Sequence, residues 1–454
     1  MNRTIASALA QTTGGKSGAR ALMEATRDAA QRTTELNAIA HVDWDAALAA
    51  AAECDRRLEE GAKSGPLHGV PVSIKDLFNV EGMPTQAGTR SPLPELARAE
   101  ATLVTRLRAA GAVPFAKTNM HEIALGATGE NRWTGDVKNP FDPARQSGGS
   151  SSGAGVAVAT GVGVGAIGSD TGGSVRIPAA FCGITGFKPT YGAIPLEGGL
   201  YLSWTCDHAG PLAPTVDDCA RLFEVMAARS VAHGAVPRAP HLLVPSDWLR
   251  GRLHPVVREH FERLCERLRS AGARVEDVPT PLLPKAGGCY TTIVRAEAAW
   301  MHREALAAGG EGFSDLVKPA LDLGVKVTAG EYIGALKERD AVCGELSAIL
   351  RGADALLLPT TAILPPLRGQ TEAEVEGGTM SVRDLVLGQT LPFSMCGLPS
   401  ISIPVGVVEN GWGPGTPTLP AGLQLVARRD GDASLLALST WVESEVGERV
   451  APPA

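Results

Sequence analysis

A lysine and two serines stand in three short segments that could together perform nucleophilic catalysis without a histidine. Lys75 lies in the apolar run GVPVSIKD, Ser150 in the glycine-rich stretch GGSSSG, and Ser174 in a second such stretch, DTGGSVR. A buried, neutral lysine can act as the base that activates a serine hydroxyl. These residue types predict a serine-dependent hydrolase of amide-like bonds, in which Ser150 relays a proton between Lys75 and the nucleophile Ser174.

Lys75 has to be desolvated for this chemistry, and its apolar neighbours favour burial. Complete burial disfavours the charged ammonium and lowers the pKa of a lysine by as much as roughly 3–5 units, which allows it to accept a proton near pH 7. Taken alone, Lys75 is better explained by a side chain that reaches solvent or pairs with Asp76. One glycine-serine loop alone would likewise suit a linker or a helix cap. The combination of two such loops with the lysine favours the catalytic interpretation.

The second serine loop lies between a predicted buried strand, 162–168, and a helix expected to begin near Pro178. A strand-to-helix turn points several backbone N–H groups at one spot, where they can stabilise a negative charge. The amides predicted to form an oxyanion hole are those of Thr171, Gly172, Gly173 and Ser174.

Two charged residues flank this turn. Asp170 and Arg176 are placed to pair, and we expect the pair to hold the turn rigid, since ordinary surface charges are less expected beside so much apolar sequence. The residues expected to contact the substrate are Thr128, Gly149 and Ser151. No histidine or cysteine pattern has the spacing of a metal site, so neither a metal nor a cofactor is expected.

The composition describes a large protein with a sizeable core. The chain has 454 residues, of which 44% are hydrophobic, and a formal net charge of −7 with scattered Lys and Arg, which argues against a nucleic-acid surface. The longest apolar run, 153–168, is interrupted by glycines, so no membrane span is expected, and no apolar signal segment is seen at the start. Eight dispersed cysteines without a Cys-x-x-Cys pair predict reduced thiols in a cytoplasmic protein.

Alternating strand and helix patterns predict one α/β domain with an inserted helical cap. The polar segment 370–380, which contains two adjacent glycines, is expected to be a loop. The predicted parts of the domain, which covers 1–454, are N-terminal helices in 1–60, a catalytic core in 61–230 and 385–450, and the cap in 285–345.

At the residues above, the chain resembles the amidase signature family of serine hydrolases. The shared motifs are the GVPxxxKD run that ends at Asp76, the Gly-Gly-Ser-Ser loop, and the DTGGSxRxPA segment that begins at Asp170; the two serines, Ser150 and Ser174, are also 24 residues apart as in the family. The resemblance implies an α/β/α fold with a mixed central sheet sandwiched between helices. It is weakest between residues 230 and 385.

The resemblance also implies how the site works. Lys75, Ser150 and Ser174 would form a Lys–cis-Ser–Ser triad, with a cis peptide between Gly149 and Ser150. The implied activity is hydrolysis of the C–N bond of small amides, aryl amides or carbamates (urethanes) through a covalent acyl-enzyme. Esterase activity is expected as a side reaction, no cofactor is implied, and a homodimer is an open expectation because many relatives are dimers.

Two other functions stay open. The first is the catalytic A component of a glutamine-dependent tRNA amidotransferase, which would need its partner proteins; His121 stands where this subfamily leads us to expect an acidic residue. The second is a non-catalytic small-molecule-binding protein with a vestigial site, which the presence of all three triad positions disfavours. Specificity is expected to reside in the segments that match the family poorly, which are 285–345, 370–382 and 128–133.

Overall fold

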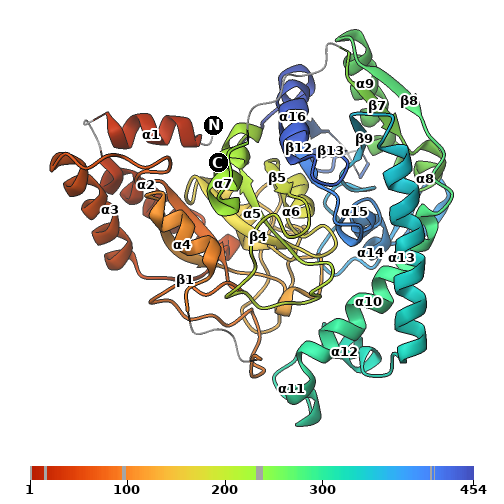
Figure 1. The fold of residues 1–454 in the computed structure, drawn as a ribbon, viewed down its shortest axis with the longest axis horizontal. Coiled ribbons are helices and arrows are strands. Elements are labelled where there is room, and N and C mark those ends of the chain that lie inside the picture. The colour runs from red at the N-terminus through yellow and green to blue at the C-terminus, as the bar shows by residue number, and fades with distance from the viewer. Residues whose placement is uncertain are drawn as a thin grey trace.

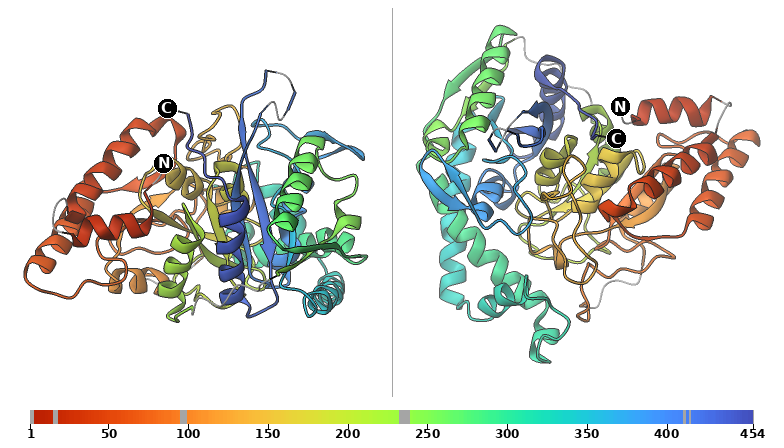
Figure 2. Two further views of the ribbon diagram at one scale, coloured as in Figure 1. Left: turned by 90° about the horizontal axis from the view of Figure 1, so that it is seen from above. Right: turned by 180° about the vertical axis from the view of Figure 1, so that it is seen from behind.

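A mixed β-sheet forms the centre of the molecule, and helices cover both of its faces (Figure 1, Figure 2). The computed structural model describes residues 3–14, 18–94, 99–231, 239–409, 412–413 and 415–453. The prediction of an α/β fold with a mixed central sheet is confirmed.

The described strands belong to one large sheet and one hairpin. They are β1 (Ile39–Val42), β2 (Pro71–Lys75), β3 (Val113–Thr118), β4 (Gly165–Asp170), β5 (Thr185–Lys188), β6 (His208–Ala213), β7 (His241–Val244), β8 (Arg274–Asp277), β9 (Ala355–Pro359), β10 (Glu372–Val375), β11 (Gly378–Ser381), β12 (Ser400–Val408) and β13 (Leu419–Val426). Eleven strands form the sheet in the order β1-β3-β2-β4-β6-β5-β12-β13-β9-β7-β8, and β10 pairs with β11 alone.

Most helices fall between these strands, several of them in a group before β9, and others precede β1 or follow β13. They are α1 (Ile5–Thr13), α2 (Gly18–Arg32), α3 (Trp44–Glu59), α4 (Thr102–Ala109), α5 (Ser152–Thr160), α6 (Arg176–Cys182), α7 (Val216–Ala227), α8 (Ser246–Leu249), α9 (Pro255–Ser270), α10 (Ala286–Met301), α11 (Arg303–Ala307), α12 (Lys318–Gly324), α13 (Ala329–Ile349), α14 (Val382–Leu387), α15 (Leu391–Met395) and α16 (Asp432–Val446). Within the described residues, none of them combines the length and the apolar content needed to cross a membrane.

Strands β2 and β4 bring the predicted catalytic segments together. They are parallel neighbours, with Ile74 of β2 opposite Ile167 of β4, so their carboxyl ends reach the same edge of the sheet. Lys75 ends β2 and Asp170 ends β4, and both strands are buried along their whole length. Burial on both faces accounts for their short, largely apolar sequences, because such strands have no solvent-facing side.

Helix α5 fixes the loop that carries Ser150. It packs with α6 on one face of the sheet, while α4, α7 and α16 pack on the other. Its sequence, SGAGVAVAT, is small and apolar all round, and all but its last residue is buried. A helix without a polar face has to be enclosed by protein. Because α5 follows the Ser150 loop directly, its burial anchors that loop in the core.

Helices α10 to α13 form a helical cap beside the sheet, drawn in green and teal in Figure 1. Helix α10 packs against α12, α13 and α15. Helix α13 begins with a capping box, in which the Thr328 side chain accepts the N–H of Glu331 and the Glu331 carboxylate accepts the N–H of Thr328. These helices cover the segment 285–345, which the sequence predicts to be helical.

The segment 370–380 forms a β-hairpin, so the prediction of a loop is wrong. Strands β10 and β11 pair antiparallel, and Val375 lies opposite Gly378 across a two-residue turn. Along β10, exposed glutamates alternate with Ala373 and Val375, which are buried. This two-residue periodicity is the signal of a half-buried strand. The polar composition of the segment conceals it in the sequence.

The cysteines correct a second expectation. Cys343 of α13 and Cys396 after α15 form a disulfide, which joins the cap to the segment before β12. The other six cysteines are free, five of them buried and Cys54 partly exposed. The prediction of reduced thiols therefore holds for these six and is wrong for the pair. The two partners are 53 residues apart in the sequence, and only the packing of α13 against the core brings them together.

Candidate active site

Lys75 lies at the end of β2 with its side chain fully buried. Its Nζ atom is 2.7 Å from the Oγ of Ser150 and 2.8 Å from the Oγ of Ser169. Burial lowers the pKa of Lys75 to about 7, although the carboxylates of Asp207 and Asp170 act in the opposite direction. Near pH 7, a large fraction of Lys75 is therefore neutral and able to accept a proton.

Ser150 connects Lys75 with the second serine loop. The peptide bond between Gly149 and Ser150 is cis, as the family resemblance implies. The carbonyl of Ser150 accepts the N–H of His121 at 3.1 Å, and the next residue, Ser151, donates its N–H to the carbonyl of Ser174 at 3.3 Å. The two loops are thus joined through their backbones, with the Ser150 hydroxyl directed at the lysine.

A buried ion pair fixes the turn that carries Ser174. Arg176 donates from Nε and Nη2 to the Asp170 carboxylate, both at 3.0 Å, and neither side chain is exposed. Burial alone would raise the pKa of Asp170, but the Arg176 guanidinium outweighs it and holds that pKa well below its usual range. Arg176 also donates to Gln424 of β13 and Ser394 of α15, both at 2.6 Å. The expected pair therefore links the turn to two distant elements.

The amides of this turn differ in whether they are already hydrogen-bonded within the protein. The N–H of Gly173 donates to the Asp170 carboxylate at 2.7 Å, so this member of the predicted oxyanion hole is already occupied within the protein. The amides of Thr171, Gly172 and Ser174 have no acceptor among the described residues. Three amides, one fewer than the sequence suggests, are left to stabilise an oxyanion.

Both glycines of the turn are required by their surroundings. Gly173 has a φ of +136°, which glycine adopts without steric cost, and a Cβ at this position would collide with the side chain of Thr390. Thr390 in turn donates from Oγ1 to the carbonyl of Gly172 at 2.6 Å. A Cβ on Gly172 would collide with the hydroxyl of Tyr290. The turn is therefore packed against α10 and against the start of α15.

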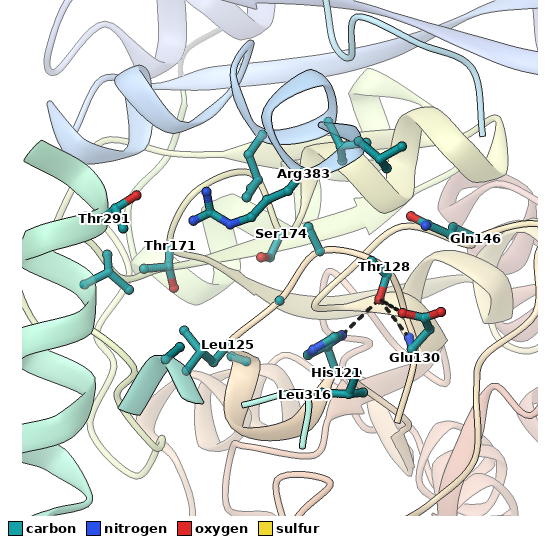
Figure 3. A pocket seen from close by; sticks show the side chains of 18 of the residues that line it. His121, Leu125, Thr128, Glu130, Gln146, Thr171, Ser174, Thr291, Leu316 and Arg383 are labelled. Carbon is teal, nitrogen blue, oxygen red and sulfur yellow. Dashed lines mark hydrogen bonds between the residues drawn. The ribbon is translucent and has the colours of Figure 1, made fainter. Parts of the chain in front are cut away.

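Ser174 lies in the wall of a cavity of about 440 Å³ (Figure 3). All three segments expected to carry specificity contribute to this wall: α10 and α12 of the cap, the hairpin region around Thr371, and the stretch that contains Thr128 and Glu130. The wall is mainly aliphatic, with side chains of Leu125, Leu202, Val294, Leu316, Val386 and Leu387.

The three residues expected to bind the substrate occupy different places. Thr128 lines the cavity, and its Oγ1 is 3.3 Å from the Nδ1 of His121. Gly149 and Ser151 are not part of the cavity wall. The Oγ of Ser151 donates to the carbonyl of Ser169 at 3.1 Å and accepts the amide of Ser169 at 3.2 Å, which ties the start of α5 to β4. The sequence does not show which way these neighbouring side chains point, and the geometry gives Ser151 a structural role.

Three buried residues near the triad are not assigned to the site by sequence reasoning. Ser169 contacts Lys75, as described above. Asp207 accepts a hydrogen bond from the Thr171 hydroxyl at 2.6 Å, and burial raises its pKa to about 6. His121 lines the cavity, and burial followed by the charge of Lys75 lowers its pKa to about 4, so the imidazole is neutral at pH 7. Asp207 lies in the family-like motif DxxGP, which is the signal that could have found it.

Within the part of the chain that the structure describes, no group of three or more His, Cys, Asp or Glu side chains is arranged to hold a metal ion. The fold and the positions of Lys75, Ser150 and Ser174 agree with the class of serine-dependent hydrolases that the sequence motifs predict.

Comparison with known proteins supports this class. The Amidase family matches residues 21–436, and the A component of the glutamyl-tRNA(Gln) amidotransferase of Symbiobacterium thermophilum is 34% identical over 92% of this chain and 91% of its own length. A crystal structure of an amidase aligns with a TM-score of 0.94 at 46% identity and covers 98% of this chain and 100% of that chain. A chain from a vestigial protein complex that reveals the evolutionary origins of an s-triazine catabolic enzyme aligns with a TM-score of 0.90 at 30% identity and covers 99% of this chain and 100% of that chain. The chain belongs to the amidase signature family, whose enzymes act on carbon–nitrogen bonds.

Proposed function

We propose that this protein hydrolyses the C–N bond of small amides, aryl amides or carbamates (urethanes) through an acyl-enzyme formed on Ser174. The observation that carries the proposal is the 2.7 Å contact between Lys75 Nζ and Ser150 Oγ, next to a cavity whose wall contains Ser174. A buried base, a relay hydroxyl, and a nucleophile beside unoccupied amides are the parts that acyl transfer requires.

Acylation begins when the neutral amine of Lys75 accepts the proton of Ser150. Ser150 accepts the proton of Ser174 as the Ser174 oxygen attacks the carbonyl carbon. Among the described residues no hydrogen bond joins these two hydroxyls, so the contact has to form when the substrate binds, as catalytic hydrogen bonds often do. The free amides of the turn stabilise the oxyanion. The C–N bond then breaks, Ser150 gives a proton to the leaving amine, and Lys75 returns its proton to Ser150.

Deacylation runs the same relay with water as the nucleophile. Ser150 accepts a proton from water, the acyl carbon–oxygen bond breaks, and Ser174 recovers its proton. For a carbamate, the amine leaves first, so the acyl-enzyme is a carbonate ester of Ser174. Its hydrolysis gives a carbonic acid monoester, which loses carbon dioxide and leaves the alcohol. An ester has a better leaving group than an amide and needs the same oxyanion stabilisation, which is why esterase side activity is part of the proposal.

The purified chain tests the proposal with a matched set of substrates: a 4-nitroanilide, an aryl carbamate, a 4-nitrophenyl ester and glutamine. We expect Ser174-dependent turnover of the anilide or the carbamate, with a loss of about 10⁴-fold in Ser174→Ala. A matched control is Ser439→Ala, because Ser439 is buried in α16, remote from the site, and should leave turnover unchanged. Near-normal activity of Ser174→Ala would contradict the proposed nucleophile.

A second candidate is the catalytic component of a glutamine-dependent tRNA amidotransferase. It is favoured by the 34% identity over 92% of the chain to the A component of such an enzyme. This function predicts that the chain alone does not hydrolyse the anilide, the carbamate or the ester. It also predicts that ammonia is released from glutamine only after the partner proteins are added. Turnover of the anilide by the chain alone would favour the stand-alone amidase.

A further inference from the structure

The cavity above Ser174 has two cationic side chains in a mainly aliphatic wall. Arg295 comes from α10 and Arg383 from α14, and both line the cavity. Figure 3 shows the guanidinium of Arg383 extended toward the side where Thr291 lies. Thr291 and Arg295 are four residues apart on α10, so they share one face of that helix. The two arginines therefore converge on one side of the cavity.

Neither arginine is neutralised by a strong partner inside the cavity. In the described part of the chain, Arg295 forms no ion pair. Arg383 pairs only with its neighbour Asp384, at 3.6 Å, and the side chains of Arg383 and Asp384 are each more than half exposed. The carboxylate that lines the same cavity, Glu130, is on the other side, beside Thr128 (Figure 3). Its oxygens accept the Thr128 hydroxyl and the amide of Gly369. One side of the cavity thus has a net positive charge, which the exposed carboxylate of Asp384 offsets only in part.

We infer that the substrate carries a carboxylate, separated from the scissile carbonyl by an apolar spacer, and that Arg295 and Arg383 bind this carboxylate. The spacer would lie along the aliphatic wall between Ser174 and the arginines. Guanidinium groups bind carboxylates through paired, charge-assisted hydrogen bonds, which are stronger in a partly enclosed site than in water. This inference rests on the proposed function, because it names the substrate class of the same site.

Binding to an inactive variant tests the inference independently of catalysis. In a Ser174→Ala background, calorimetry compares glutaric acid mono-4-nitroanilide with its carboxamide analogue, which has the same shape without the charge. A second pair, 4-(butyrylamino)benzoate and 4-(butyrylamino)benzamide, places the carboxylate on the leaving-group side. We expect the carboxylate to bind about tenfold more tightly than the carboxamide in at least one pair.

Substitution of the arginines should remove this preference. Arg295→Gln combined with Arg383→Gln should bring the affinity ratio of that pair close to one, while the carboxamide keeps its affinity and so reports an intact cavity. Arg383→Lys should retain part of the preference. Arg351→Gln is the matched control, since Arg351 is exposed at the end of α13, outside the cavity, and should leave the ratio unchanged.

Two results would overturn the inference. The first is a carboxylate-to-carboxamide affinity ratio close to one in both pairs, or no binding at all. The second is a preference for the carboxylate that survives in the double arginine variant. Turnover by the chain with Ser174 intact separates this failure from a failure of the proposed function. Hydrolysis of the uncharged amides without any carboxylate preference would leave the amidase standing and reject the carboxylate site. Binding of the carboxylates without Ser174-dependent hydrolysis would support the carboxylate site and reject the proposed amidase.

Discussion

The wall of the cavity that contains Ser174 and the wall that faces it are built differently. The Ser174 wall consists of strand ends and buried loops, and its polar groups are tied together, as the ion pair of Asp170 with Arg176 and the contacts of Lys75 show. The facing wall comes from the cap and from α14. Its Arg383 is more than half exposed and has only Asp384, at 3.6 Å, as a charged partner. Chemistry needs fixed geometry, whereas the choice of substrate depends on a surface that can vary.

This contrast predicts that substitutions in the two walls fail in different ways. A change among the buried polar groups should reduce stability and the hydrolysis of every substrate alike. A change in the facing wall should alter the relative rates for different substrates and leave the common chemistry in place. The predictions below test this difference, beginning with the largest expected effect.

Arg176→Met should cause the largest loss of stability. It leaves Asp170 fully buried without its counter-charge, and breaking a buried ion pair in this way typically costs about 3–5 kcal/mol. Urea unfolding followed by circular dichroism measures the loss. Turnover of all substrates should also fall, since Asp170 holds the amides of Gly173 and Val175.

The same substitution at an exposed ion pair provides the control. Arg221 pairs with Asp217 at 2.8 Å, with 41% and 42% of the two side chains exposed, and Arg221→Met should cost no more than about 1 kcal/mol. Equal losses for the two variants would show that the buried pair does not hold the turn.

The pH dependence of hydrolysis should report the protonation of Lys75. The active form is the neutral amine, which is present above the pKa and is lost as the pH falls through it. With this pKa lowered by burial to about 7, kcat/KM should approach a tenfold decrease per pH unit below that value, or roughly a hundredfold at pH 5. A flat profile down to about pH 5 would argue against a neutral lysine base.

Asp207 sharpens this prediction because its negative charge raises the pKa of Lys75. Asp207→Asn should therefore move the acid limb of the profile to lower pH. Asp217→Asn, which removes an exposed carboxylate of α7, should leave it in place. A shift of equal size in both variants would point to a general charge effect in place of a local one.

The sequence predicts the Ser174 wall well because its parts are contiguous motifs. Lys75, Ser150 and Ser174 each stand among neighbours that show their environment, and the parallel pairing of β2 with β4 then brings them to one edge. Ser169 and Asp207 escape this reasoning because their contacts to the site depend on side-chain direction and on the folding of distant loops. The same limit explains why the sequence predicts a substrate contact for Ser151, although its side chain ties α5 to β4.

The facing wall can be predicted only as a set of segments. The poor match of these segments to the family predicts that they carry specificity, but no local pattern distinguishes Arg295 or Arg383 from an ordinary surface charge. Tyr290 shows the same difficulty, because an aromatic side chain suits a core as well as a pocket, and the folded chain places this one in both. Such positions are set by the packing of α10 against the turn of Gly172, which sequence periodicity does not report.

Val294→Ala should give the smallest effect and the clearest signature of the facing wall. Val294 is buried on α10 and lines the cavity, so removing its two methyl groups widens the space above Ser174. A methylene group in an apolar pocket changes kcat/KM by roughly 10–200-fold, and we expect the low end of that range, about tenfold, for a substrate that fills the space. The kcat/KM of bulky acyl anilides should therefore rise relative to that of the acetyl anilide, whose kcat should not change.

Val342→Ala is the matched control, because Val342 is also buried in the cap, on α13, but does not line the cavity. It should lower stability without altering the substrate order, and a reordering by both variants would mean that the cap acts as a unit.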